Sequence, residues 1–319
     1  MTFRIGSFAQ SQALLSDTLR NQSKTFDTQR QVSSGYKSDD YKGLGREATT
    51  LLSAKSTRSR LEAHKQNNTR LDLKLNFYDT TMRELEDSAR SLKQNVLTAL
   101  SSTNGTLMID QVKNILDRTI GLLNTQLDGK YIFAGTRTDT KPVNITDAAG
   151  LLALPEPPTG AFDNNQIKPS TRIDDNVVME YGMLADEVGQ DFLQAMQRIL
   201  MFDSGTLPAG ATAYGPAGSF GNPLTENQVA FLENELSRMQ SAADGITAQT
   251  AANGIRQKQL EDTQIRQERE VTFIKGFVGE IEDVNLAEAV TRLNQDQVAL
   301  NASFNVISKL NNFSLLNFL

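Results

Sequence analysis

Residues 286–319 read LAEAVTRLNQDQVALNASFNVISKLNNFSLLNFL, and this stretch decides the fold. Its apolar residues recur at alternating intervals of four and three, a heptad spacing that places them on one face of a helix. The members of this stripe are Leu286, Val290, Leu293, Leu300, Phe304 and Ile307, with Gln297 in the middle and Leu316 and Leu319 extending the apolar character. Because a single helix of this kind gains little stability in water, the stripe predicts packing against another helix.

The other end of the sequence has the same pattern. Its stripe is made of Ile5, Phe8, Leu15, Leu19 and Phe26, with Gln12, Gln22 and Gln29 at the remaining heptad positions. Glutamine in such a stripe weakens the packing but can fix its register. We therefore expect the two ends to pair with each other, with other copies of the chain, or with both.

Proline and charge divide the chain of 319 residues into two kinds of sequence. All eight prolines lie between residues 142 and 223, and residues 141–224 carry four basic against ten acidic side chains. Since proline breaks helix interiors, the tracts on either side permit long helices. The sequence predicts a mainly α protein: a long antiparallel helical bundle or coiled coil, 1–140 plus 225–319, with a small α+β insert at 141–224.

Local patterns predict the remaining elements. Long helices are expected over 44–100, where a second heptad stripe begins at Leu71, and over 225–281, where Thr225 opens a capping box. Shorter helices are expected over 108–127 and 187–201. A β-rich run is expected at 130–135, and a hairpin at 172–181 with its turn at Asp175 and Asn176.

Composition excludes several classes of protein. The net charge of −6 offers no basic patch for nucleic acid, and there is no cysteine for disulfides or thiolate metal sites. No apolar run approaches the ~20 residues of a membrane span, and the N-terminus has no secretory signal. We therefore expect no membrane insertion and no export by a cleaved signal peptide.

The sequence predicts no catalytic, metal or cofactor site. The single histidine, His64, is expected to be exposed on a charged helical face. Residues 43–48 match G-x-G-x-x-A, but a charged turn precedes them, so they are interpreted as a helix entry. The neighbouring acids at 39–40, 174–175 and 282–283 lie where turns or helix ends are expected, positions at which carboxylates cap and solvate. An enzyme is therefore not expected.

The heptad stripes allow two interpretations. A self-contained helix bundle that buries all of its own stripes is the commoner fate of such patterns. An apolar terminus favours the second interpretation, burial against another molecule, because exposed apolar patches mark contacts.

Particular motifs resemble the bacterial flagellin superfamily. Residues 29–35 (QRQVSSG) followed by Ser38-Asp39-Asp40 are similar to its signature after the first helix, although Tyr41 stands where that family has proline. Residues 123–136 (LNTQLDGKYIFAGT) and 313–319 (FSLLNFL) resemble the hook-associated, hook–filament junction members. The resemblance covers 1–140 and 225–319, and only weakly the insert.

The resemblance implies a structural protein of the flagellum that joins hook to filament as a ring of subunits, with residues 1–35 and 284–319 as its polymerisation helices. Its partners would be copies of itself, a neighbouring hook-associated protein, flagellin, and a cytosolic export chaperone on the C-terminal helix. It would pass unfolded through type III export to the extracellular flagellum, and its insert would face outward. Filament flagellin is the alternative, and an enzyme carried by the insert is a third hypothesis from another class.

Overall fold

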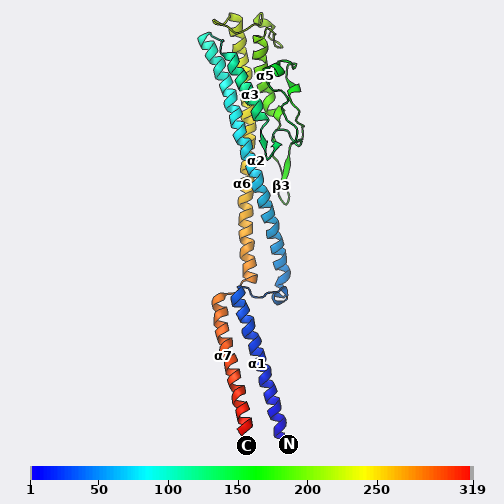
Figure 1. Cartoon of the computed structure of the whole chain (residues 1–319), viewed down its shortest axis with the longest axis vertical. Coiled ribbons are helices and arrows are strands. Elements are labelled where there is room, and N and C mark those ends of the chain that lie inside the picture. The colour runs from blue at the N-terminus through cyan, green and yellow to red at the C-terminus, as the bar shows by residue number, and fades with distance from the viewer. Residues whose placement is uncertain (1, 317–319) are drawn as a thin grey trace. The chain divides into compact units, whose positions relative to one another are not determined.

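The computed structural model describes the backbone of residues 2–316 and the side chains of residues 9–309. The described residues contain six helices of 16 residues or more (Figure 1): α1 (Thr2–Ser34), α2 (Glu47–Ser102), α3 (Met108–Leu123), α5 (Ala185–Asp203), α6 (Glu226–Glu282) and α7 (Leu286–Leu316). The strands form two small hairpins, so the predicted mainly α class is confirmed. The chain divides into two compact units, residues 1–62 with 268–319 and residues 63–267.

In the unit of residues 63–267, α2 and α6 run antiparallel and share one core with α3 and α5. The predicted stripe on α2 is buried from Leu71 through Tyr78 and Met82 to Ala99. Insert residues enter the same core, where the Phe202 ring stacks on Phe231 of α6 with 4.1 Å between ring centroids. The short helix α4 (Ala148–Leu152) also packs on α5. Residues of the insert are thus held by the long helices through shared apolar burial.

The β-rich run predicted after the third helix is shorter than expected. The helix predicted over 108–127 ends at Leu123, and a hairpin of β1 (Gln126–Leu127) and β2 (Lys130–Tyr131) follows. Its turn residues Asp128 and Gly129 both have positive φ, 52° and 73°. The helix stops early because the Asn124 side chain bonds both backbone groups of Val143, at 3.0 and 3.1 Å.

The predicted second hairpin is present as β3 (Ser170–Asp174) and β4 (Val177–Glu180). Its inner face places Ile173 and Met179 against an apolar cluster of Leu71, Leu75 and Leu260 on the long helices. The buried amides of Asn68 and Gln267 both donate to the Ile173 carbonyl, at 2.9 and 2.8 Å. These contacts fix the hairpin along α2 and α6.

The expectation for His64 is wrong. Its side chain is only 13% exposed, and Nε2 lies 3.1 Å from Oδ1 of Asp175 in the hairpin turn. The sequence around His64 is charged, but the hairpin folds over this part of α2 and covers the ring. His64 therefore has a structural contact, which helps to hold the hairpin.

In the other unit, the two connections between helices are bonded to each other. Gly35 ends α1 with φ of 77°, as expected of a C-terminal cap. Backbone bonds then join Lys37 N to Glu282 O at 2.7 Å and Val284 N to Gly35 O at 2.9 Å. Residues 43–48 form a helix entry, as predicted, because a 3-10 turn (Tyr41–Leu44) leads into α2. Leu51 of α2 packs here on Val278 and Ile281 of α6.

Candidate assembly surface on the terminal helices

On the α1 side, small polar side chains are the ones buried in the contact with α7. Among the side chains of α1 that the structure describes, residues 9–34, the buried ones are Thr18, Thr25 and Thr28, with exposed fractions of 4%, 9% and 5%. The hydroxyls of Thr18 and Thr25 donate to the carbonyl four residues earlier in α1, at 2.8 and 2.9 Å, and the Thr28 hydroxyl, with its single hydrogen, lies within reach of both the Lys24 carbonyl at 2.9 Å and Asp296 of α7 at 2.8 Å. The hydroxyls are thereby satisfied, so a close approach of α7 costs little desolvation.

Two side-chain hydrogen bonds fix the register of this helix pair. Asn21 Nδ2 donates to Ser303 Oγ at 2.9 Å, and Thr28 Oγ1 donates to Asp296 Oδ2 at 2.8 Å. Thr28 follows Asn21 along α1, whereas its partner Asp296 precedes Ser303 along α7, so the two helices are antiparallel (Figure 1). The ends of the chain therefore pair within one subunit through polar contacts.

The heptad stripe of α1 is not the face that meets α7. Leu15, Leu19 and Phe26 are 54%, 58% and 59% exposed. Such large apolar side chains on one face of a helix form a surface with unfavourable hydration. The stripe is free for a contact outside the subunit.

The stripe of α7 divides between two environments. Leu293, Leu300 and Ile307 are half-buried beside α1, whereas Leu286, Val290 and Phe304 are 53%, 44% and 50% exposed. Two further exposed valines, Val298 and Val306, were missed by the heptad analysis because they lie off the predicted stripe. We use the name terminal apolar surface for the exposed apolar side chains of α1 and α7 together: Leu15, Leu19, Phe26, Leu286, Val290, Val298, Phe304 and Val306.

Four predicted contact residues cannot be placed on this surface. The side chains of Ile5, Phe8 and Leu316 lie outside the described side chains, and Leu319 lies outside the described residues altogether. Their heptad positions remain a prediction from the sequence.

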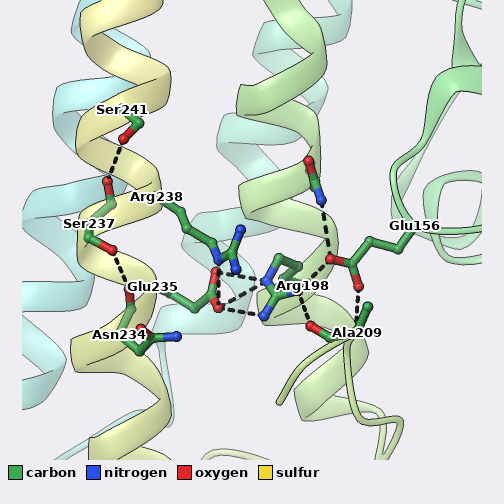
Figure 2. A network of polar contacts seen from close by, with 9 residues as sticks. Glu156, Arg198, Ala209, Asn234, Glu235, Ser237, Arg238 and Ser241 are labelled. Carbon is green, nitrogen blue, oxygen red and sulfur yellow. Dashed lines mark hydrogen bonds and ion pairs between the residues drawn. The ribbon is translucent and has the colours of Figure 1, made fainter.

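In the unit of residues 63–267, the structure contains a buried ionic network that the sequence analysis did not predict (Figure 2). Arg198 of α5 and Glu235 of α6 are 2% and 0% exposed, and Arg198 Nη2 lies 2.8 Å from Glu235 Oε1. Arg198 also pairs with Glu156, and it donates to the Ala209 carbonyl at 2.9 Å. The available sequence signal was a single charged residue, Arg198, within a largely apolar helical stretch at 192–202.

Hydrogen bonds to the Glu156 carboxylate affect its pKa more than its burial does. Burial alone would raise the pKa of this carboxyl, but the Ala209 amide, at 2.8 Å, and the Arg198 guanidinium lower it below its ordinary value. The carboxylate is therefore stabilised in its charged form. The network ties the loops at 156 and 209 to α5 and α6, which makes it a structural feature.

Other kinds of site are not evident in the part of the chain that the structure describes. Among these residues, no three histidine, aspartate or glutamate side chains converge in a way that could hold a metal ion. Within the same range, every helix is too short or too polar to cross a bilayer.

The fold and this surface define a class: helical proteins whose two ends form a pair with apolar faces left free. Residues 236–319 match the family model of the bacterial flagellin C-terminal helical region, and the predicted resemblance to the flagellin superfamily is confirmed there. No curated protein sequence matches the chain.

Two solved structures have a similar fold. One is a protein of Vibrio parahaemolyticus that is assigned as a flagellar hook-associated protein. It is 20% identical with a TM-score of 0.58, and the match covers 76% of this chain and 98% of that chain. The other is FlgL of Bacillus cereus, 12% identical with a TM-score of 0.52, covering 72% and 98%. These two likenesses establish the fold, and the family match establishes a flagellin-like C-terminal region at residues 236–319.

Proposed function

We propose that this chain is a structural subunit of the flagellar axis that joins hook to filament. In this role the terminal apolar surface of each copy packs against neighbouring copies, which form a ring. The main support is that Leu15, Leu19 and Phe26 remain more than half exposed although α1 is already paired with α7. Contacts between different faces of identical subunits build rings or helical arrays, as an adaptor between two helical polymers requires.

The partners follow from the same proposal. The ring would contact a hook-associated protein on one side and flagellin on the other, in the extracellular flagellum. Before export, a cytosolic chaperone would cover α7, whose exposed leucine, valine and phenylalanine side chains would otherwise promote association. Residues 141–224 would form the outward-facing part of the subunit.

Substitution of the α1 stripe tests the proposal. We expect Leu15→Ser with Leu19→Ser to abolish incorporation at the hook tip and motility, because the buried apolar area between subunits would be lost. Circular dichroism and the midpoint of thermal unfolding of the monomer should change little, since both side chains are exposed. Incorporation is measured by labelling the hook–filament boundary in cells that express the variant.

A matched control separates this effect from general surface change. Leu73→Ser with Leu107→Ser replaces two leucines that are 64% and 70% exposed and belong to residues 63–267 rather than to α1 or α7. Cells that express this control variant should incorporate it at the hook tip and remain motile. Normal incorporation of the Leu15→Ser, Leu19→Ser variant would contradict the proposal.

Filament flagellin is the alternative function, since the family match at 236–319 is to a flagellin region. Polymerisation of the purified chain distinguishes the two roles. Long filaments formed by this chain alone would favour flagellin, whereas short rings or no polymer would favour the junction role. An enzyme carried by the insert has less support, because Glu156, Asp174 and Glu187 are engaged in ion pairs and Asp175 contacts His64.

A further inference from the structure

A crevice opens beside the β1–β2 hairpin, in the unit of residues 63–267. Its volume is about 360 Å³, and its apolar lining includes Leu127, Ile132 and Pro169 together with the rings of Tyr131 and Tyr181. These side chains are contributed by the hairpin, by the loop before β3 and by the residue after β4. The crevice therefore offers an apolar pocket large enough for a branched aliphatic side chain.

Two opposite charges stand on the β1–β2 hairpin at the crevice. Asp128 and Lys130 both line it, and both are exposed. Neither has an ion-pair partner among the side chains that the structure describes. The hairpin thus presents one unpaired anion and one unpaired cation on either side of its turn glycine.

The outward face of the β3–β4 hairpin has the complementary arrangement. Val178 is 61% exposed, and Glu180 is exposed on the same face because alternate residues of a strand point the same way. Arg172 lies directly opposite Val178 on β3 and is also exposed. This face carries an aliphatic side chain with an anion and a cation next to it.

From this complementarity we infer that the β3–β4 face of one copy docks into the crevice of a second copy. Val178 enters the apolar lining, Glu180 meets Lys130, and Arg172 meets Asp128. Arg172 and Glu180 are diagonal neighbours on an antiparallel strand pair, so they lie about 7–8 Å apart. Asp128 and Lys130, on either side of Gly129, can have a similar separation. The occupant is a second copy, because the chain's own crevice leaves Val178 and Glu180 exposed.

The hairpin is rigid enough to act as a docking element. Its inner face is buried against α2 and α6, and the Ile173 carbonyl accepts two buried amide hydrogen bonds. Asp174 is paired with Arg266 of α6. A fixed face loses little conformational entropy when it binds. The contact lies in residues 63–267 and is separate from the terminal apolar surface, so it goes beyond the proposed function.

Disulfide trapping between two variants tests the contact, because the chain contains no cysteine. Full-length Val178→Cys and Thr138→Cys chains, which carry different affinity tags, are mixed and oxidised. Thr138 lines the crevice, so we expect a mixed disulfide dimer to form at least about tenfold faster than in the control. The control mixes Val178→Cys with Leu107→Cys, whose position is well exposed but outside the crevice. Equal rates in the two mixtures would overturn the inference.

A charge exchange provides a second measurement. Lys130→Glu or Glu180→Lys alone should lower the trapping rate about two- to fivefold, the range for an exposed ion pair. The double variant should recover the original rate, because the pair is restored with reversed sign. A double variant that traps more slowly than both single variants would contradict the pairing. Repeating the trapping in the Leu15→Ser, Leu19→Ser background separates this contact from the terminal apolar surface: the rate should persist there even if the proposed flagellar role fails.

Discussion

At the residue scale, Arg198 determines how the insert is held. Its guanidinium is 2% exposed and binds two carboxylates, Glu156 from a loop and Glu235 from α6. A buried charge is tolerated only when its partners are in place, because each unpaired ion in an apolar interior is costly. The three side chains therefore stabilise the fold only as a set.

Removal of the central cation should destabilise residues 63–267 strongly. We expect Arg198→Met to lower the free energy of unfolding by about 3–5 kcal/mol, because Glu156 and Glu235 would remain buried without a partner. Urea unfolding followed by circular dichroism measures the change. Arg238→Met is the matched control: Arg238 is half-exposed and 3.6 Å from Glu235, so its loss should cost less than about 1 kcal/mol. Similar losses in the two variants would contradict the central role of Arg198.

Glu156 should make the stability depend on acid pH. Because its pKa is lower in the folded chain than in the unfolded one, it contributes stability above its unfolded pKa, which is lost as the pH falls through the folded pKa. We expect Glu156→Gln to be less stable at neutral pH and to lose less stability than the original chain between about pH 5 and pH 3. Thermal unfolding across this range measures both effects, and an unchanged slope would argue against the network as its source. Burial would raise the pKa of Asp174, but hydrogen bonds from the Asp175 backbone amide and Arg266 lower it, so this carboxylate accounts for part of the remaining slope.

At the element scale, local signals determine where helices begin and end. Thr225 and Gln228 form the predicted capping box of α6: the Thr225 amide donates to Gln228 Oε1 at 3.0 Å, and the Gln228 amide donates to Thr225 Oγ1 at 3.3 Å. Gly35 ends α1 for an equally local reason, its positive φ. Such boundaries could be predicted because the residues that set them are neighbours in the sequence.

Loss of the capping threonine should weaken α6 at its start. We expect Thr225→Ala to destabilise residues 63–267 by about 0.5–2 kcal/mol, because the backbone N–H of Gln228 would lose the Thr225 hydroxyl as its acceptor. Thr247→Ala, an exposed position inside the same helix, should cost nothing, since alanine is the better helix former. Urea unfolding of the two variants gives the comparison, and equal effects would mean that the cap does not stabilise α6.

At the scale of the whole molecule, two units have different kinds of stability. Residues 63–267 bury large apolar clusters, whereas α1 and α7 meet through threonine, asparagine and serine side chains and through apolar side chains of α7 that are only half-buried. The core should persist without the terminal pair, because hydrophobic burial dominates folding. The terminal pair gains most from contacts that neighbouring copies would supply.

Deletion of residues 286–319 tests this division. We expect the truncated chain to keep the cooperative unfolding of residues 63–267 and to lose incorporation into the flagellar axis. Hydrogen exchange of α1 should accelerate at least about tenfold, because its partner helix is gone. A truncated chain that still assembles would mean that α7 is dispensable for the proposed role. Loss of protection throughout residues 63–267 would mean that the core depends on the terminal pair.

The sequence by itself determined the helical class, the long stripe on α2 that begins at Leu71, the β3–β4 hairpin and the capping box at Thr225. Each rests on periodicity or on contacts between near neighbours, which can be predicted without a fold. Tertiary structure alone decided which face of α1 meets α7, that His64 lies under a hairpin turn, and that Arg198 joins Glu156 to Glu235. Those outcomes depend on residues far apart in the chain, since burial and ion pairing are set by what the folded backbone brings together.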